Sequence, residues 1–449
     1  MTKMQGKMNR SYLFLKQCLV ASLVLIFSTI ASAQWSTLDL SEPKDGVTAI
    51  GLGSKVYFAG GGTSSFNINA RTSKIEIFDT KTKQWSIAQL SQARQGIAAV
   101  QLGSKLLFAS GDYRTNVDIY DTLTNQWTVR NLPEGRNGLA GTSLNTKAYF
   151  GGGYDGPGFF RETVYIFDTV TNVWTTKALS VGRARLTAAS VGDKVIFAGG
   201  EVSGGYSKVV DIYNTTTNMW TTAELSEARG FLKSATIGNK VFFVGGLKSD
   251  AAGRSGSNVV DIYDNATGLW TKTTLTNARL GHAVAVLGNK LYVAGGNNYL
   301  GVFHRSVEIY DTNLGQWEAT QQLSSIRTGL SGVSAAGYLF FAGGDTRSAL
   351  VSTIDVTPTI RVSTKDFQKK DMSIYPSSAS DYIVCQLDKA QNYDNLTIDI
   401  VDMTGRIHAV KSLINKDHTL IDISQLPVGI YKLRAFEGNS FWIGSFMKK

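Results

Sequence analysis

The sequence predicts an all-β protein, a seven-bladed β-propeller followed by a small C-terminal β-sandwich, and two observations support this prediction. The first is a set of tryptophans that recur at intervals of 42, 47, 46, 50 and 47 residues: Trp85, Trp127, Trp174, Trp220, Trp270 and Trp317. The second is the composition, because the 449 residues include 46 Gly but only 6 Pro, and 43% are hydrophobic while 18% are charged. This balance favours a large packed core of short strands and tight turns over disorder.

Two further features repeat in register with the tryptophans. Six residues before each Trp stands an acidic or amide residue that follows an aromatic one: Asp79, Asp121, Asp168, Asn214, Asp264 and Asp311. Each unit also has an apolar run that ends in Gly-Gly, or once in Ser-Gly, at 60–61, 110–111, 152–153, 199–200, 245–246, 295–296 and 343–344. A period of this length with four apolar runs per unit is typical of four-stranded blades around an axis.

The residues of each unit indicate the order of its four strands. The innermost strand is small and apolar, as in 96–100, because inner strands crowd near the axis. A two-residue turn such as Gly103-Ser104 joins it to a bulkier strand, whose final glycines let backbones pack closely. The third strand carries the aromatic-Asp pair, and the fourth carries the Trp.

The seventh unit lacks its fourth strand. Residues 354–356 match a third strand, but Thr357 and Pro358 replace the aromatic-Asp pair and no Trp follows. Residues 34–41 match the missing strand. We therefore expect a propeller over residues 34–359 whose last blade is closed by the N-terminal strand, which leaves no free sheet edge.

The glycine pair, the aromatic-Asp pair and the spaced Trp resemble kelch repeats, and the resemblance covers residues 34–359. Galactose oxidase has a kelch-type propeller that uses copper, His ligands and a Tyr linked to Cys. The propeller predicted here has no Cys, and its only histidines are His282 and His304. The sequence therefore excludes that copper chemistry and predicts no cofactor.

Residues 1–33 have the pattern of a secretory signal peptide. Four basic residues and no acidic one lie in the first 16, and an almost wholly apolar stretch follows over 19–31. We expect cleavage between Ala33 and Gln34. The apolar stretch is shorter than the ~20 residues of a bilayer span, which favours a signal over a retained anchor. Removing the four charges takes the net charge from +10 to 10 − 4 = +6, which gives little support to nucleic-acid binding.

The composition changes after the propeller. Residues 360–371 are polar and charged and are interpreted as a linker, whereas segments of 372–449 alternate apolar and polar residues as in a small β-sandwich. Residues 372–449 resemble the C-terminal sorting domain of type IX (Por) secretion in Bacteroidetes. The matching residues include Gly405, Arg406, Gly429, Tyr431, Lys448 and Lys449. The resemblance implies recognition by the type IX machinery and a secreted or surface-attached protein. An unrelated adhesive sandwich is the alternative.

One basic residue recurs where the chain enters each innermost strand. The set is Lys44, Arg94, Arg136, Arg183, Arg229, Arg279 and Arg327, and Arg185 adds a further charge. A ring of cations at the mouth of the central channel would favour an anionic ligand. The alternative is structural, because a residue repeated in every unit commonly bonds backbone carbonyls or a neighbouring acid.

Two loops between second and third strands carry aromatic residues beside arginine. One contains Tyr154, Phe159, Phe160 and Arg161, and the other contains Tyr299, Phe303 and Arg305. Exposed aromatics of this kind stack on sugar faces or on peptide side chains. The alternative is that they pack over the rim of the propeller.

The sequence favours a binding or interaction module for a glycan or an extracellular protein over an enzyme, because no catalytic motif is present. The expected partners are that ligand and the type IX machinery, with no nucleic acid and no membrane span in the mature chain. The alternative function is a metal-free carbohydrate-active enzyme, a sialic-acid mutarotase-like protein or a lyase, that uses an Arg/Glu pocket on the propeller face. A passive surface component is a third possibility.

Overall fold

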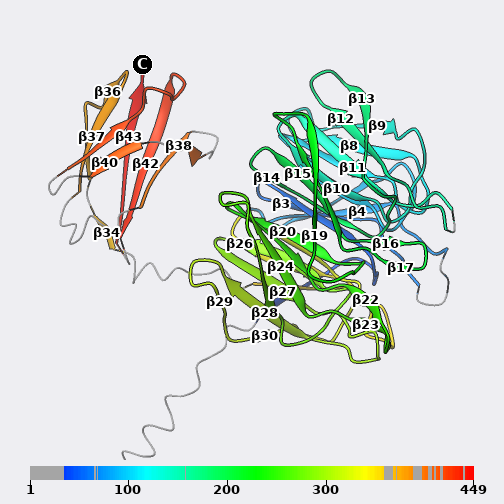
Figure 1. Cartoon of the computed structure of the whole chain (residues 1–449). Coiled ribbons are helices and arrows are strands. Elements are labelled where there is room, and N and C mark those ends of the chain that lie inside the picture. The colour runs from blue at the N-terminus through cyan, green and yellow to red at the C-terminus, as the bar shows by residue number, and fades with distance from the viewer. Residues whose placement is uncertain are drawn as a thin grey trace, which may run out of the picture. The chain divides into compact units, whose positions relative to one another are not determined.

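The computed structural model describes residues 35–64, 67, 69–156, 158–357, 368–370, 372–387, 397–402, 407–408, 411–414, 418–437 and 440–449. The chain forms two compact units, and every element in the described ranges is a strand. The first unit is the propeller, and the second contains the C-terminal strands (Figure 1).

Seven antiparallel sheets of four or five strands form the ring of the first unit, and we number them as blades one to seven by their inner strands. The inner strands are β2 (Thr48–Leu52), β6 (Ala98–Leu102), β10 (Ala140–Leu144), β14 (Thr187–Val191), β20 (Lys233–Ile237), β26 (Ala283–Leu287) and β31 (Ser331–Ala335). Each lies beside the next in this order, and β31 lies beside β2, so the ring is closed.

The second strand of each blade is almost wholly buried because blades pack on both of its faces. The second strands are β3 (Lys55–Ala59), β7 (Lys105–Ala109), β11 (Lys147–Gly151), β15 (Lys194–Ala198), β21 (Lys240–Val244), β27 (Lys290–Ala294) and β32 (Tyr338–Ala342). The third strands are β4 (Lys74–Asp79), β8 (Asn116–Asp121), β12 (Thr163–Asp168), β18 (Val209–Asn214), β24 (Val259–Asp264), β28 (Ser306–Asp311) and β33 (Thr353–Val356).

The outer strands carry the repeated tryptophans, which cover the aromatic residue that precedes each turn acid. In blade two the ring of Trp127 stacks on Tyr120, with 4.8 Å between ring centroids. Such a pair contributes about 0.5–1.5 kcal/mol beyond its buried area. The outer strands are β5 (Trp85–Gln89), β9 (Gln126–Asn131), β13 (Val173–Ala178), β19 (Met219–Glu224), β25 (Trp270–Thr274), β29 (Gln316–Trp317) with β30 (Gln321–Gln322), and β1 (Ser36–Asp39).

Strand β1 supplies the outer strand of blade seven. It pairs antiparallel with β33, and Ser36 lies opposite Val356. The preceding Trp35 is buried, and its ring lies 5.4 Å from that of Phe341. The first described strand and the last strand of the propeller therefore close the ring together.

The turns that enter the inner strands and the loops between second and third strands lie at one end of the propeller, here called the loop face. Isolated bridges join the two sets, as between Ala184 and Glu201 and between Gly230 and Leu247. Two of the loops form hairpins, one in blade four and one in blade five. They are β16 (Glu201–Val202) with β17 (Gly205–Tyr206), and β22 (Leu247–Asp250) with β23 (Gly253–Gly256).

Two sheets form the second unit and enclose a core that includes Trp442, Ile400 and the free thiol of Cys385. One contains β34 (Gln368–Lys370), β36 (Ser378–Ala379), β38 (Thr397–Asp402), β39 (Ile407–His408), β42 (Gly429–Glu437) and β43 (Ser440–Lys448). The other contains β35 (Met372–Tyr375), β37 (Tyr382–Leu387), β40 (Lys411–Ile414) and β41 (Thr419–Asp422). The expected linker over 360–371 extends too far, because Gln368–Lys370 pairs parallel with β43.

Candidate functional site

The structure corrects the expectation of an open ring of cations. The side chains of Lys44, Arg94, Arg136, Arg183, Arg229, Arg279 and Arg327 are all fully buried. Six of them pair with a carboxylate on the third strand of the same blade, as Arg183 does with Asp211 at 2.5 Å. The same carboxylate also accepts a backbone N–H from the preceding turn, such as that of Ser180. These cations hold each blade together and leave no charge free for a ligand.

Blade three has Tyr165 at the position of the paired acid. Arg136 therefore donates a hydrogen bond to the Tyr165 hydroxyl at 3.1 Å and pairs with Glu134 at 2.7 Å and Asp155 at 3.3 Å. Asp155 also accepts a hydrogen bond from Arg161. This contact is the main reason that the pKa of Asp155 lies below its ordinary value. The arginine of the blade-three loop is thus engaged by an acid of its own loop.

A second position of the entering turns breaks the repeat. Two residues after each buried cation, five blades have glycine at positive φ: Gly46, Gly96, Gly138, Gly281 and Gly329. Blades four and five instead have Arg185, with φ 53°, and Phe231, with φ 55°. A side chain in this left-handed region costs about 1–2 kcal/mol, so these two side chains are held there by their surroundings.

Arg185 is the centre of a cluster on the loop face. Its guanidinium lies 4.7 Å from the ring centroid of Phe231 and 5.3 Å from that of Tyr154. It donates a hydrogen bond to the Tyr154 hydroxyl at 3.0 Å and forms an ion pair with Glu201. The ring of Tyr113 meets Tyr154 edge-on at 5.6 Å. We call Tyr113, Tyr154, Glu201, Arg185 and Phe231 the arginine–aromatic cluster.

Of the other predicted loop residues, one contacts the cluster and the others lie away from it or are exposed to solvent. Phe160 packs edge-on against Tyr154 at 6.3 Å, whereas Phe159 is 62% exposed. Tyr299 is 47% exposed, and its interaction with Arg254 raises the pKa of that guanidinium group. The other two residues of the blade-six loop, Phe303 and Arg305, are not brought to the cluster: Phe303 bridges to Asn297, and Arg305 donates to Gln322.

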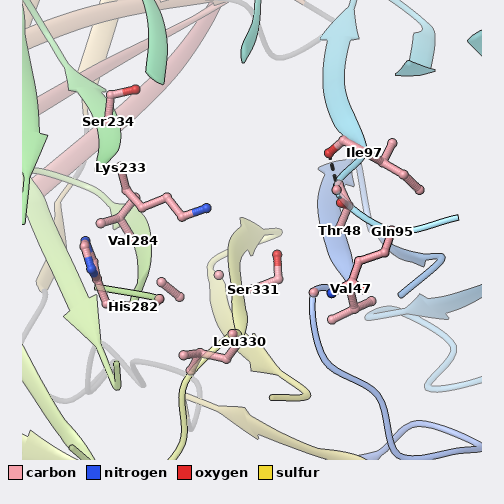
Figure 2. Close-up of a pocket in the computed structure, with 16 residues that line it drawn as sticks. Val47, Thr48, Gln95, Ile97, Lys233, Ser234, His282, Val284, Leu330 and Ser331 are labelled. Carbon is pink, nitrogen blue, oxygen red and sulfur yellow. Dashed lines mark hydrogen bonds between the residues drawn. The ribbon is translucent and has the colours of Figure 1, made fainter. Parts of the chain in front are cut away.

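A cavity of about 430 Å³ lies where the inner strands begin, on the axis of the propeller. The entering turns and inner strands of blades one, two, five, six and seven line it. Figure 2 shows Lys233 extending into this space, with His282 at its edge and the Thr48 and Ser331 side chains around it. We call it the channel pocket.

Sequence reasoning missed Lys233 and His282, although a signal was present. Four residues after the buried cation, the other six blades have small side chains, whereas blade five has Lys233. Three residues after it, the other six have Val, Ile or Leu, whereas blade six has His282. Counting positions from the repeated cation would have identified both residues.

Desolvation lowers the pKa of both Lys233 and His282. The side chain of Lys233 is accessible within the channel but surrounded by protein, and this desolvation lowers the pKa of its ammonium group. Desolvation likewise holds the pKa of His282 well below its ordinary value, and the charges of Arg279 and Lys233 add to the effect. His282 is therefore neutral at physiological pH.

The remaining predicted residues lie in the second unit or outside the described ranges. Tyr431 is buried and donates a hydrogen bond to the Pro427 carbonyl at 2.8 Å, and Lys448 is buried beside the terminal Lys449. Gly429 begins β42. The predicted cleavage residues Ala33 and Gln34 and the sorting residues Gly405 and Arg406 lie outside the described residues.

Two classes of site are not found in the described ranges. No group of three His, Cys, Asp or Glu side chains there is placed to hold a metal ion. No helix there is long and apolar enough to cross a bilayer.

Comparisons with known proteins match both units. A KLHDC2/KLHL20/DRC7 Kelch-repeats domain model matches residues 138–344, and a Kelch motif model matches residues 43–89. A secretion system C-terminal sorting domain model matches residues 373–449. No curated protein matches the chain significantly.

A solved structure shares the fold. It is a novel fungal alcohol oxidase of the AA5 family in complex with copper, with 14% sequence identity and a TM-score of 0.62. The match covers 93% of this chain and 99% of that one, and at this identity it shows the fold alone. The family matches establish that the chain is a kelch-repeat protein that carries a C-terminal secretion sorting domain.

Proposed function

We propose that this protein is a secreted binding module that holds a glycan on its loop face, at the arginine–aromatic cluster. The sorting domain supports delivery to the cell surface or the extracellular space. The entering turns and the loops between strands are the variable parts of a repeated scaffold, and a repeat fold places its specificity there.

One observation carries the proposal. Of seven equivalent turn positions, the two that hold side chains in the left-handed region are Arg185 and Phe231, and these two side chains contact each other. Glycine would serve the fold without strain, as it does in the other five blades. Strained residues that persist beside one another are typical of ligand sites.

The chemistry of the cluster suits a sugar. The ring of Tyr113 is 43% exposed, meets Tyr154 edge-on, and is of the kind that packs on sugar C–H groups. Arg185 supplies a fork of donors, and Glu201 supplies an acceptor beside it. Because Arg185 and Glu201 pair with each other, the cluster is less suited to the Arg/Glu catalysis of the enzyme alternative, and binding is favoured.

An extracellular protein is a second candidate ligand. Phe159, Tyr299, Leu300 and Val302 are large exposed hydrophobic residues on loops of the same face. Exposed apolar groups beside arginine are typical of protein-binding surfaces. Binding to an extracellular protein in the absence of glycan binding would favour this candidate.

Arg185→Gly tests the proposal. This change installs the residue used by five other blades, so we expect the melting temperature to change little. Loss of charge-assisted hydrogen bonds should weaken glycan binding about tenfold or more. The measurement is binding of the secreted protein to a panel of neutral and acidic glycans.

Arg347→Gly is the matched control. Arg347 is an exposed arginine at φ 81° on the blade-seven loop, and it contacts none of the cluster residues described above. We expect this variant to bind glycans as the wild type does. If no glycan binds to the wild type, the glycan proposal is wrong.

A further inference from the structure

The channel pocket contains two neighbouring departures from the seven-fold pattern. The inner strands begin with Thr48, Ala98, Ala140, Thr187, Lys233, Ala283 and Ser331. Lys233 is the one long and charged member of this set, and it points into the pocket beside His282 (Figure 2). Residues common to all blades build the propeller, so a charge present in one blade needs a different explanation.

Lys233 also differs from the buried cations in having no partner. Six of the seven repeated cations pair with a carboxylate on the third strand, and the seventh pairs with Glu134 and Asp155. No hydrogen bond or ion pair joins the ammonium group of Lys233 to any group in the described part of the chain. An ammonium group that projects into a cavity without a counter-charge is suited to pairing with an anionic ligand.

The rest of the lining is neutral. Among the sixteen residues that line the pocket, Lys233 is the one with a charged side chain, because His282 is held neutral by burial. Thr48, Gln95 and Ser331 add hydroxyl and amide groups that donate and accept hydrogen bonds. The pocket therefore combines one positive charge with groups suited to sugar hydroxyls.

We propose that the channel pocket binds the carboxylate of an acidic sugar through Lys233, so that the module prefers glycans that contain uronic acids. This inference rests on the proposed glycan binding at the loop face and adds the class of sugar. The ammonium group of Lys233 carries one positive charge, which matches the single negative charge of a carboxylate, and the arginine that bidentate phosphate recognition uses is absent from the lining. The volume of about 430 Å³ lies within the range of small-ligand sites.

The test compares a galacturonate disaccharide with the corresponding neutral galactose disaccharide by calorimetry on the secreted protein. We expect the wild type to bind the acidic disaccharide at least tenfold more tightly. Lys233→Thr, which copies Thr48 of blade one, should weaken acidic binding by about 10- to 100-fold and leave neutral binding unchanged. Lys233→Met keeps the length of the side chain and should behave in the same way.

Lys248→Thr is the matched control, because Lys248 is also a lysine of the loop face but already pairs with Glu227 at 3.5 Å. This variant should retain the preference for galacturonate. Equal binding of the two disaccharides by the wild type, or a preference that survives Lys233→Thr, would overturn the inference and leave glycan binding standing. Failure of both disaccharides and of every panel glycan to bind would reject the inference and the proposed function together.

Discussion

At the scale of the residue, the same type of side chain has different roles on the two sides of one turn. Arg183 is fully buried, pairs with Asp211 and donates a hydrogen bond to the Val209 carbonyl at 2.7 Å. Arg185, two residues later, lies on the loop face with its guanidinium over two aromatic rings. The first arginine is part of the fold, and the second belongs to the cluster that we propose binds a glycan.

The buried pairs should dominate the stability of individual blades. Asp211→Ala leaves Arg183 buried without its counter-charge, so we expect the free energy of unfolding to fall by about 3–5 kcal/mol. Urea denaturation of the propeller measures this loss.

Glu224→Ala is the comparison, because Glu224 pairs with Lys208 while both side chains are more than half exposed, at 59% and 51%. Its expected cost is about 0–1 kcal/mol. Equal losses in the two variants would contradict the structural role given to the buried cations.

The sequence could predict the positions of the repeated cations and of the third-strand acids, but not that they pair with each other. The repeated cation is visible from its spacing, and so is the acid of the third strand at positions such as Asp118 and Asp261. Their pairing depends on strand register and on burial, which the spacing of residues does not determine. Lys233 was not predicted because it interrupts the repeat, whereas the predictions rested on residues that recur in every blade.

At the scale of the element, β1 joins the two ends of the propeller. It covers the edge of β33, and Trp35 and Leu40 beside it are buried. The fold was predictable here because strand four of each unit carries a recognisable Trp. The left-handed backbone conformations of Arg185 in blade four and Phe231 in blade five were not predictable, because φ is a property of the backbone that a single sequence does not show.

Trp35→Ala tests the contribution of this strand. A buried aromatic truncated to Ala costs about 3–5 kcal/mol, and the loss should appear in the whole propeller because the ring closes through β1. Thermal unfolding measures the effect.

Trp85→Ala is the matched control, since Trp85 holds the same position in blade one but is 37% exposed. We expect a clearly smaller loss for this variant. A loss as large as that of Trp35→Ala would show that the closing strand has no special role.

At the scale of the whole molecule, each unit has its own core and a separate task. The propeller clusters run between neighbouring blades, whereas Trp442, Ile421 and Leu433 belong to a core formed within the second unit. Self-contained cores are expected of domains that fold as units. We therefore expect the proposed binding and the export to be separable by mutation.

Deletion of residues 372–449 tests this separation. The family match assigns these residues to secretion, so the truncated protein should remain inside the outer membrane while the full chain reaches the surface or the medium. Cell fractionation measures the distribution.

The Arg185→Gly variant provides the converse case, because its sorting domain is intact and it should be exported normally while losing glycan binding. Export of the truncated chain at the wild-type level would contradict the assignment of the second unit, and retention of Arg185→Gly would show that the loop-face change acts through folding rather than through the ligand.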